Sequence, residues 1–200
     1  MRPLIVSYYV KGSPYEKEAA ELKRSCEKFG WECEIAAIED KDSWNANCCY
    51  KPEFILQCLE KFNRSLIWMD IDSVLVQNPT IFEECCADVA FRINDNVPNT
   101  SPMRMLASPM FINNSLSAKK LLSFWKKECE KLIKQDPNAL DQVGLRKVVL
   151  HYPTIVEIKR LPLTYVAVTE NPENRFSYHE SAVIVHHELS RIYNSEMATV

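Results

Sequence analysis

The N-terminal part of the chain alternates short apolar runs with a segment of helical periodicity. The run from Leu4 to Val10 predicts a buried strand, and Trp31–Ile38 predicts a second one. Between them, Ser13-Pro14-Tyr15-Glu16 has the residues that open a helix, with Ser13 as the cap and Pro14 in the first turn. Gly30 ends the apolar stripe of this helix, because glycine readily takes the left-handed conformation that closes a helix. The pattern therefore predicts a strand, a helix and a strand in succession.

The same alternation continues as far as a pair of aspartates. A polar stretch, Glu39–Asn47, precedes a predicted helix from about Pro52 to Phe62. The apolar run Leu66-Ile67-Trp68-Met69 then predicts a third strand, which Asp70 and Asp72 follow. Because crossovers between parallel strands are right-handed, this β-α-β-α-β order predicts an α/β fold with a doubly wound, mainly parallel sheet and helices on both faces.

The rest of the chain predicts further strands and helices, with no repeat and no linker. The expected strands are Ala87–Ile93, Met105–Asn113, Thr154–Leu161 and Ala182–His187, and the expected helices are Ser117–Lys134 and Asp141–Leu150. Pro109 has no backbone N–H, so it places its strand at a sheet edge or at a bulge. We expect residues 1–200 to form a single domain.

Composition and charge narrow the class of protein. With 46% hydrophobic and 26% charged residues, the 200-residue chain matches ordinary globular proteins, and its formal net charge of −3 argues against a nucleic-acid partner. No segment is long enough for a transmembrane helix, and Leu4–Val10 is too short for the core of a signal peptide. The eight cysteines form no Cys-x-x-Cys pair, so we expect free thiols and a cytoplasmic location.

Chemistry is expected where the third strand ends. Only three glycines occur, so the chain has no glycine-rich phosphate loop and would have to hold a nucleotide by other means. In open α/β sheets, ligands bind beyond the carboxyl ends of the strands, which is where Asp70 and Asp72 lie. Two carboxylates at this spacing can share Mg²⁺ or Mn²⁺, although a polar turn that only ends the strand has the same pattern.

An ordered set of motifs resembles the nucleotide-sugar glycosyltransferases of the GT-A fold. The motifs are Trp44-x-x-Asn47, Lys51-Pro52, Trp68-Met69-Asp70-Ile71-Asp72-Ser73, Asn78-Pro79, Asp141-Gln142 and His186-His187-Glu188-Leu189-Ser190-Arg191. The resemblance runs from Ser7 to Arg191 and implies one GT-A-like domain. It implies transfer of a sugar from a nucleoside-diphosphate-sugar donor, with Mn²⁺ or Mg²⁺ as cofactor, to an unidentified acceptor such as a glycan, a lipid or a protein.

The resemblance also implies a ligand set for the metal ion. Asp72 is implied as a direct ligand, and Asp70 as a contact to the metal or to the donor ribose. A late histidine often completes such a site, and we expect His186 rather than His187, because adjacent strand residues face opposite sides. The ion would stabilise the charge that develops on the departing nucleotide. The alternative is a surface histidine pair at the end of a strand.

Further residues are candidates for contacts to the donor. Arg191 suits phosphate oxygens, and Lys51 opposes the dipole at a helix start, which indicates a partner outside the helix such as a donor phosphate. A solvated surface lysine is the alternative for Lys51. The motifs add Trp44 and Asn47, and the end of the first strand adds Ser7 and Tyr9, for which packing is an equal explanation.

Asp141-Gln142 is implied near the donor sugar, as a catalytic base, a nucleophile or a contact to a sugar hydroxyl. The alternative is an acidic residue selected by the dipole of the helix that starts there. Two other functions stay open, namely a non-catalytic nucleotide-sugar-binding module and a sugar nucleotidyltransferase. The second usually has a basic, glycine-rich phosphate loop, which Ser7–Ser13 lacks. A two-carboxylate glycosidase is disfavoured. Its acid and its nucleophile flank the sugar about 5 Å or more apart, whereas the motif here gathers both carboxylates at one strand exit.

Overall fold

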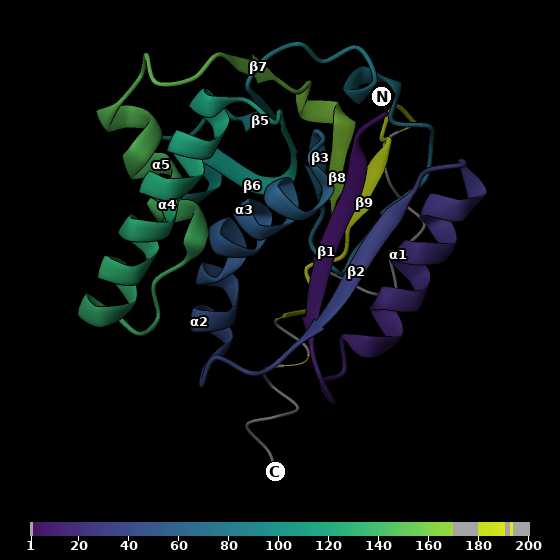
Figure 1. Ribbon diagram of the computed structural model, residues 1–200, viewed down its shortest axis with the longest axis horizontal. Helices are drawn as coiled ribbons and strands as arrows, with labels where there is room; N and C mark the ends of the chain where they lie inside the picture. The colour runs from purple at the N-terminus through teal and green to yellow at the C-terminus, as the bar shows by residue number, and fades with distance from the viewer. Residues whose placement is uncertain (1, 170–179, 191–192, 194–200) are drawn as a thin grey trace.

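A computed structural model of the protein describes residues 2–169, 180–190 and 193. Its centre is a six-stranded sheet with the strand order β2-β1-β3-β6-β5-β7 (Figure 1). The strands are β1 (Leu4–Val10), β2 (Cys33–Ile38), β3 (Leu66–Trp68), β5 (Val89–Ile93), β6 (Met105–Ile112) and β7 (Ile158–Arg160). Of the predicted strands, the one over Thr154–Leu161 is the most shortened.

The central sheet is mainly parallel, as the sequence predicts. β1 is parallel to its neighbours β2 and β3, and β5 is parallel to β7. β6 is antiparallel to β3 on one side and to β5 on the other. It follows that β6 alone runs against the other five strands of this sheet.

The strand that contains Pro109 lies in the middle of the sheet. The edge position is therefore wrong, and the bulge is correct. Ala90 pairs with Phe111 and Arg92 pairs with Leu106, so one residue of β5 lies opposite residues 107–110 of β6. The bulge removes Pro109 from the regular β5–β6 ladder, where its missing N–H would leave a carbonyl without a partner.

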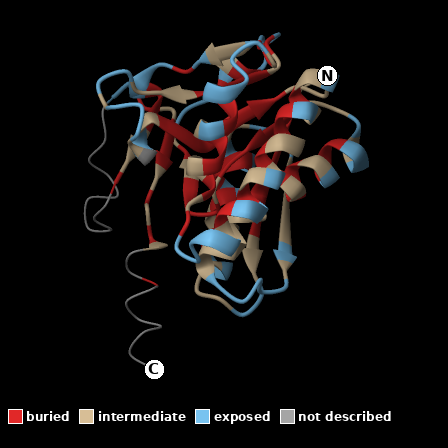
Figure 2. Ribbon diagram, turned by 90° about the vertical axis from the view of Figure 1, so that its left-hand side faces the viewer, coloured by how far each residue is buried: buried red, intermediate tan, exposed pale blue. Residues whose placement is uncertain are grey.

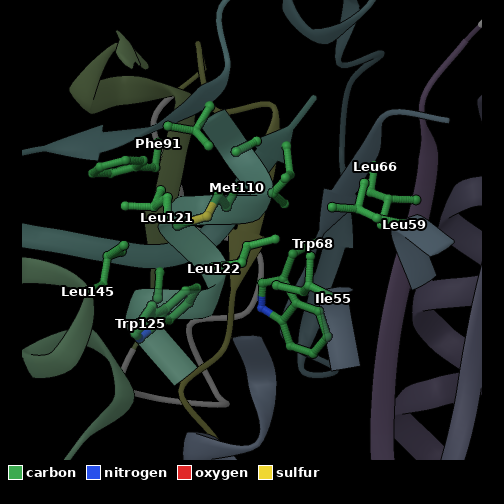
Figure 3. Close-up of a cluster of buried hydrophobic side chains, with 14 of the residues drawn as sticks. Ile55, Leu59, Leu66, Trp68, Phe91, Met110, Leu121, Leu122, Trp125 and Leu145 are labelled. Carbon is green, nitrogen blue, oxygen red and sulfur yellow. The ribbon is translucent and has the colours of Figure 1, made fainter. Parts of the chain in front are cut away.

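Helices cover both faces of the sheet, which confirms that prediction (Figure 1). One face carries α3 (Lys51–Phe62), α4 (Leu116–Gln135) and α5 (Asp141–His151), with the short α2 (Trp44–Cys49) beside them. Their apolar side chains pack on one face of the sheet, for example around Trp68 and Met110 (Figure 3). The other face packs against α1 (Glu16–Lys28) and a second, smaller sheet. Figure 2 shows the buried residues gathered in the strands between these layers.

The second sheet was not predicted. It contains β4 (Ser73–Leu75), β9 (Ile184–His186) and β8 (Val166–Val168), in the order β4-β9-β8. The strand predicted over Ala182–His187 exists in shorter form as β9, but it pairs here rather than in the central sheet. In the antiparallel pairing of β4 with β9, Ser73 lies opposite His186. Short 3₁₀ turns at Thr80–Phe82, Pro102–Arg104 and Leu163–Tyr165 complete the described elements.

One prediction about a helix start is wrong, and one short helix was not predicted. Helix α1 begins at Glu16, and Ser13 does not cap it. The Ser13 N–H donates to the Val10 carbonyl (3.1 Å) and the Ser13 carbonyl accepts from the Glu16 N–H (3.2 Å), so the Ser13 backbone closes the turn after β1. The stretch Glu39–Asn47 is partly helical, because Ser43 Oγ accepts the Ala46 N–H (3.1 Å) and starts α2.

Two further observations concern membrane-spanning helices and cysteines. Among the described residues, no helix combines the length and the apolar character that crossing a membrane requires. The eight cysteines, all of which lie in described segments, are free thiols.

Candidate functional site

The turn between β3 and β4 holds the two aspartates in a defined conformation. The Asp70 N–H donates a hydrogen bond to Ser108 Oγ (2.8 Å), and the Asp70 carbonyl accepts one from the Ser73 N–H (3.0 Å). Trp68 Nε1 donates to Asp70 Oδ1 (2.8 Å). The turn therefore presents the Asp70 and Asp72 side chains from a backbone that is tied to both β6 and β4.

Asp72 is buried, and both its backbone and its side chain are held by other residues. It is 6% exposed, and its carbonyl accepts the His187 N–H (3.0 Å). Its Oδ2 accepts the Leu189 N–H (3.0 Å), and its Oδ1 lies 3.2 Å from His186 Nε2. Burial alone would raise the pKa of Asp72, but the neighbouring His186 and the backbone hydrogen bonds outweigh it and lower that pKa.

The pairing of β4 with β9 brings His186 to both aspartates. Its Nε2 lies 3.9 Å from Asp70 Oδ2 as well as 3.2 Å from Asp72 Oδ1. Burial alone would lower the pKa of His186, but the Asp72 and Asp70 carboxylates raise it to about 9, so the ring is a cation at neutral pH. His187 faces elsewhere, with Nδ1 3.1 Å from Thr169 Oγ1. Of the two histidines, the structure brings only His186 to the carboxylates.

Lys51 joins Asp70 to Asp141. Its ammonium lies 2.9 Å from Asp70 Oδ1 and 2.8 Å from Asp141 Oδ2, and its side chain is only 7% exposed. Burial alone would lower the pKa of Lys51, but the two carboxylates raise it above its usual range. A solvated surface lysine is therefore the wrong interpretation. Lys51 does have partners outside its helix, but in this structure they are carboxylates.

Asp141 lies at the first position of α5 and is 7% exposed. Its carbonyl accepts the hydrogen bond of Trp125 Nε1 (2.8 Å), which ties this end of α5 to α4. Burial raises the pKa of the Asp141 carboxyl, and the opposing effect of Lys51 only partly offsets it. The backbone of Gln142 likewise opposes this rise in pKa without reversing it. The structure thus brings Lys51, Asp70 and Asp141 into one connected group.

Four other candidates for donor contacts lie in β1 and α2. Ser7 is fully buried in β1, and its Oγ has no hydrogen-bond partner among the described residues, whereas Tyr9 is half-buried on the same face. The Asn47 side chain is engaged locally by the Lys41 N–H (2.8 Å) and by Asp40 (2.8 Å). Trp44 is half-buried at the start of α2. Arg191 lies outside the described residues.

Sequence reasoning missed several residues that support this group. Ser108 and Trp68 both bond Asp70, and the Leu189 N–H bonds Asp72. Tyr8 donates to the Asn47 carbonyl (2.5 Å), and its ring centroid lies 5.1 Å from that of Trp68. Trp68 had a local signal, because it precedes Asp70 by two positions and so faces the same side. The bonds of Ser108 and Leu189 join distant segments and have no local signal.

The types of side chain at this site suit a divalent cation, but their present distances suit it less well. Two carboxylates and an imidazole suit Mn²⁺, and neighbouring ligands of an octahedral ion lie about 3 Å apart. The 3.2 Å between Asp72 Oδ1 and His186 Nε2 is close to that value, whereas the 3.9 Å to Asp70 Oδ2 is wider. As they stand, no three acidic, histidine or cysteine side chains of the described segments form a group that could hold a metal ion. Binding would require loss of the His186 proton and a small approach of Asp70.

Comparisons with known proteins identify the family and the fold of the chain. A family model described as nucleotide-diphospho-sugar transferase matches residues 34–195. A similar solved structure is that of a glycosyltransferase involved in the glycosylation of the major capsid of PBCV-1. It has a TM-score of 0.64 and 17% sequence identity, and the match covers 100% of both chains, so this likeness shows the fold. No curated protein sequence matches the chain at a significant level.

Proposed function

The chain belongs to the family of nucleotide-diphospho-sugar transferases, and from this premise we propose that it transfers a sugar from a nucleoside-diphosphate-sugar donor to an acceptor. The proposed site lies where β3 ends, and Asp70, Asp72 and His186 would hold Mn²⁺ or Mg²⁺ there. One observation carries the proposal: His186 lies within 3.2 Å of Asp72 and 3.9 Å of Asp70, although it is more than a hundred residues away in sequence.

When bound, the metal ion supplies a Lewis acid that stabilises negative charge on the departing nucleoside diphosphate. The residues of the chain orient its ligands. The Leu189 N–H occupies Asp72 Oδ2 and directs Oδ1 toward His186. Trp68 and Lys51 occupy Asp70 Oδ1, which leaves Oδ2 on the side of His186. The oxygens that face His186 are therefore the ones free to bind the ion.

Lys51 and Asp141 extend the site away from the proposed metal position. Lys51 lies between Asp70 and Asp141, so it fixes the distance between the metal side and the carboxylate at the start of α5. We assign to Asp141, with Gln142, contacts to the donor sugar on the acceptor side. The raised pKa of Asp141, which results mainly from burial, makes its carboxyl easier to protonate than an ordinary aspartate and suits hydrogen bonding to a sugar hydroxyl.

The test is a hydrolysis screen over nucleotide-sugar donors with Mn²⁺ present, followed by removal of the ion with a chelator. Calorimetry of a nucleoside diphosphate with Mn²⁺ then compares the parent with Asp72→Asn, which keeps an oxygen for the Leu189 N–H but loses the charge. The matched control is Asp136→Asn at the exposed end of α4. We expect loss of Mn²⁺-dependent binding only in Asp72→Asn. Equal affinity in all three proteins would refute the site.

The same experiment separates transfer from binding alone. Mn²⁺-dependent binding of a nucleotide sugar with no release of the nucleoside diphosphate, for any donor, would favour a non-catalytic nucleotide-sugar-binding module. Arg191 adds a second measurement, since we propose that it contacts the donor diphosphate. Loss of one charge-assisted hydrogen bond costs about 1.5–3 kcal/mol, so Arg191→Ala should weaken nucleotide affinity roughly ten- to a hundred-fold. Binding of Mn²⁺ alone should persist.

A further inference from the structure

The chain segment that follows β9 is tied to Asp72 at two points. The His187 N–H donates to the Asp72 carbonyl (3.0 Å), and the Leu189 N–H donates to Asp72 Oδ2 (3.0 Å). The Tyr193 N–H donates to the Leu189 carbonyl (3.0 Å), and this hydrogen bond closes a turn. Leu189 and Tyr193 are buried, with exposed fractions of 1% and 4%.

The far end of this turn is tied to helix α1. The Tyr193 hydroxyl donates to Glu18 Oε1 at 2.6 Å, and the Tyr15 ring meets the Tyr193 ring edge-on with centroids 4.9 Å apart. Lys17 Nζ lies 4.9 Å from the centre of the Tyr193 ring. Tyr15, Lys17 and Glu18, which lie at the start of α1, therefore all contact Tyr193.

Glu18 is an unusual residue to find in this position. It is 3% exposed, and glutamate is rarely so buried unless it is paired, because an unpartnered carboxylate loses its hydration. The buried stripe of α1 otherwise consists of residues such as Leu22 and Cys26. Glu18 takes no part in the metal and donor contacts proposed above. Its hydrogen bond to Tyr193 indicates a different role.

We infer that Glu18 and Tyr193 are a positioning pair, which anchors the turn after β9 on α1 and so holds the Leu189 N–H on Asp72 Oδ2. The terminal torsion of an aspartate is broad and roughly two-fold, so the Asp72 carboxylate has little orientation of its own. With Oδ2 held by Leu189, Oδ1 faces His186. Without the anchor the turn loosens, and both Asp72 oxygens become free to rotate. The inference rests on the proposed function, since the consequence is for metal affinity.

The first measurement needs no metal. Hydrogen exchange in the metal-free protein should show the Leu189 amide protected in the parent and less protected, by tenfold or more, in Tyr193→Phe. That substitution removes only the hydroxyl and keeps the ring packing on Tyr15. Tyr152→Phe is the matched control, because Tyr152 is 46% exposed and its ring packs beside Phe124 of α4, away from Glu18. Unchanged protection of Leu189 in Tyr193→Phe would overturn the inference.

The second measurement is the dissociation constant for Mn²⁺ alone. Changes in the hydrogen-bond partners of metal ligands typically cost 10–100-fold in metal affinity, and we expect a loss of about tenfold in Tyr193→Phe and Glu18→Ala. Glu18→Gln keeps an oxygen that can accept the tyrosine hydroxyl, so it should stay within threefold of the parent. A similar loss in Glu18→Gln and Glu18→Ala, with Tyr193→Phe unchanged, would mean that the buried charge matters rather than the hydrogen bond, and would overturn the pair.

The two measurements keep the two proposals apart. If the parent protein binds no Mn²⁺ but Tyr193→Phe still exposes the Leu189 amide, the proposed metal site fails and the anchor stands. If the parent binds Mn²⁺ and both Tyr193→Phe and Glu18→Ala bind it equally well, the anchor has no effect on Asp72 and the positioning role fails. Combining Tyr193→Phe with Glu18→Ala should add little to either single loss, since both remove the same hydrogen bond.

Discussion

Replacement of Lys51 by methionine should strongly destabilise the protein. Methionine fills a similar volume with a flexible apolar chain, so the change removes the charge with little loss of packing. Lys51 is 5% exposed and lies within 3 Å of both Asp70 and Asp141. Removing one partner of a buried ion pair costs about 3–5 kcal/mol, because the other charge is left buried and uncompensated. We expect the free energy of unfolding at pH 7 to fall by that amount.

The pH dependence of this loss can be derived from Asp141. Burial already raises its pKa with Lys51 present, and removal of the cation raises it further. The native state of the variant then binds more protons than the unfolded chain, whose aspartates titrate at about pH 4. Stability therefore falls as the pH rises from about 4 through the raised folded pKa. The difference between variant and parent should be largest near neutral pH and smaller near pH 4.

Urea unfolding at the two pH values measures both effects. The matched control is Lys61→Met, because Lys61 and its partner Glu34 are 63% and 44% exposed, and surface pairs contribute at most about 1 kcal/mol. Adding Asp141→Asn to Lys51→Met should recover part of the lost stability. If Lys51→Met unfolds at the same urea concentration as Lys61→Met, the buried network does not stabilise the protein. Loss of donor affinity at unchanged stability would instead support a phosphate contact for Lys51.

Three further predictions test other parts of the structure. His186 has its pKa raised to about 9 by Asp72 and Asp70 against the opposing effect of burial, so Mn²⁺ must displace its proton. Calorimetric Mn²⁺ affinity should therefore rise about tenfold per pH unit below that value, and a flat profile would argue against ligation by His186. Gly144→Ala would place a Cβ 3.1 Å from Cys129 Sγ and 3.2 Å from Trp125, which is itself hydrogen-bonded to Asp141. The overpacking penalty of about 1–3 kcal/mol should exceed the gain of about 1 kcal/mol in helix propensity, so we expect a lower Tm. A higher Tm would show that the α4 side chains move to accommodate the added methyl group. Thiol titration of denatured, unreduced protein should find all eight cysteines free, and a shortfall of two or more would indicate an oxidising compartment.

The sequence by itself determined the elements that carry a long periodic signal. The strand Leu4–Val10 has the predicted bounds, and the helices α3, α4 and α5 start or end within one or two residues of expectation. Each of these is stabilised by burial of its own apolar face, so the local pattern is sufficient. The position of Asp70 and Asp72 after a buried strand was also readable, because the strand and its polar exit are adjacent in the chain.

Only the tertiary structure decided what meets at that exit. The strands β4, β8 and β9 have three residues each, which is too short for a periodic pattern, and they form a sheet only by pairing distant segments. That pairing brings His186 to Asp72. The partners of Lys51 and the bond between Glu18 and Tyr193 likewise join residues far apart in sequence. Such contacts depend on how the packed layers bring separate segments together, and a local pattern of apolar and polar residues contains no information about that.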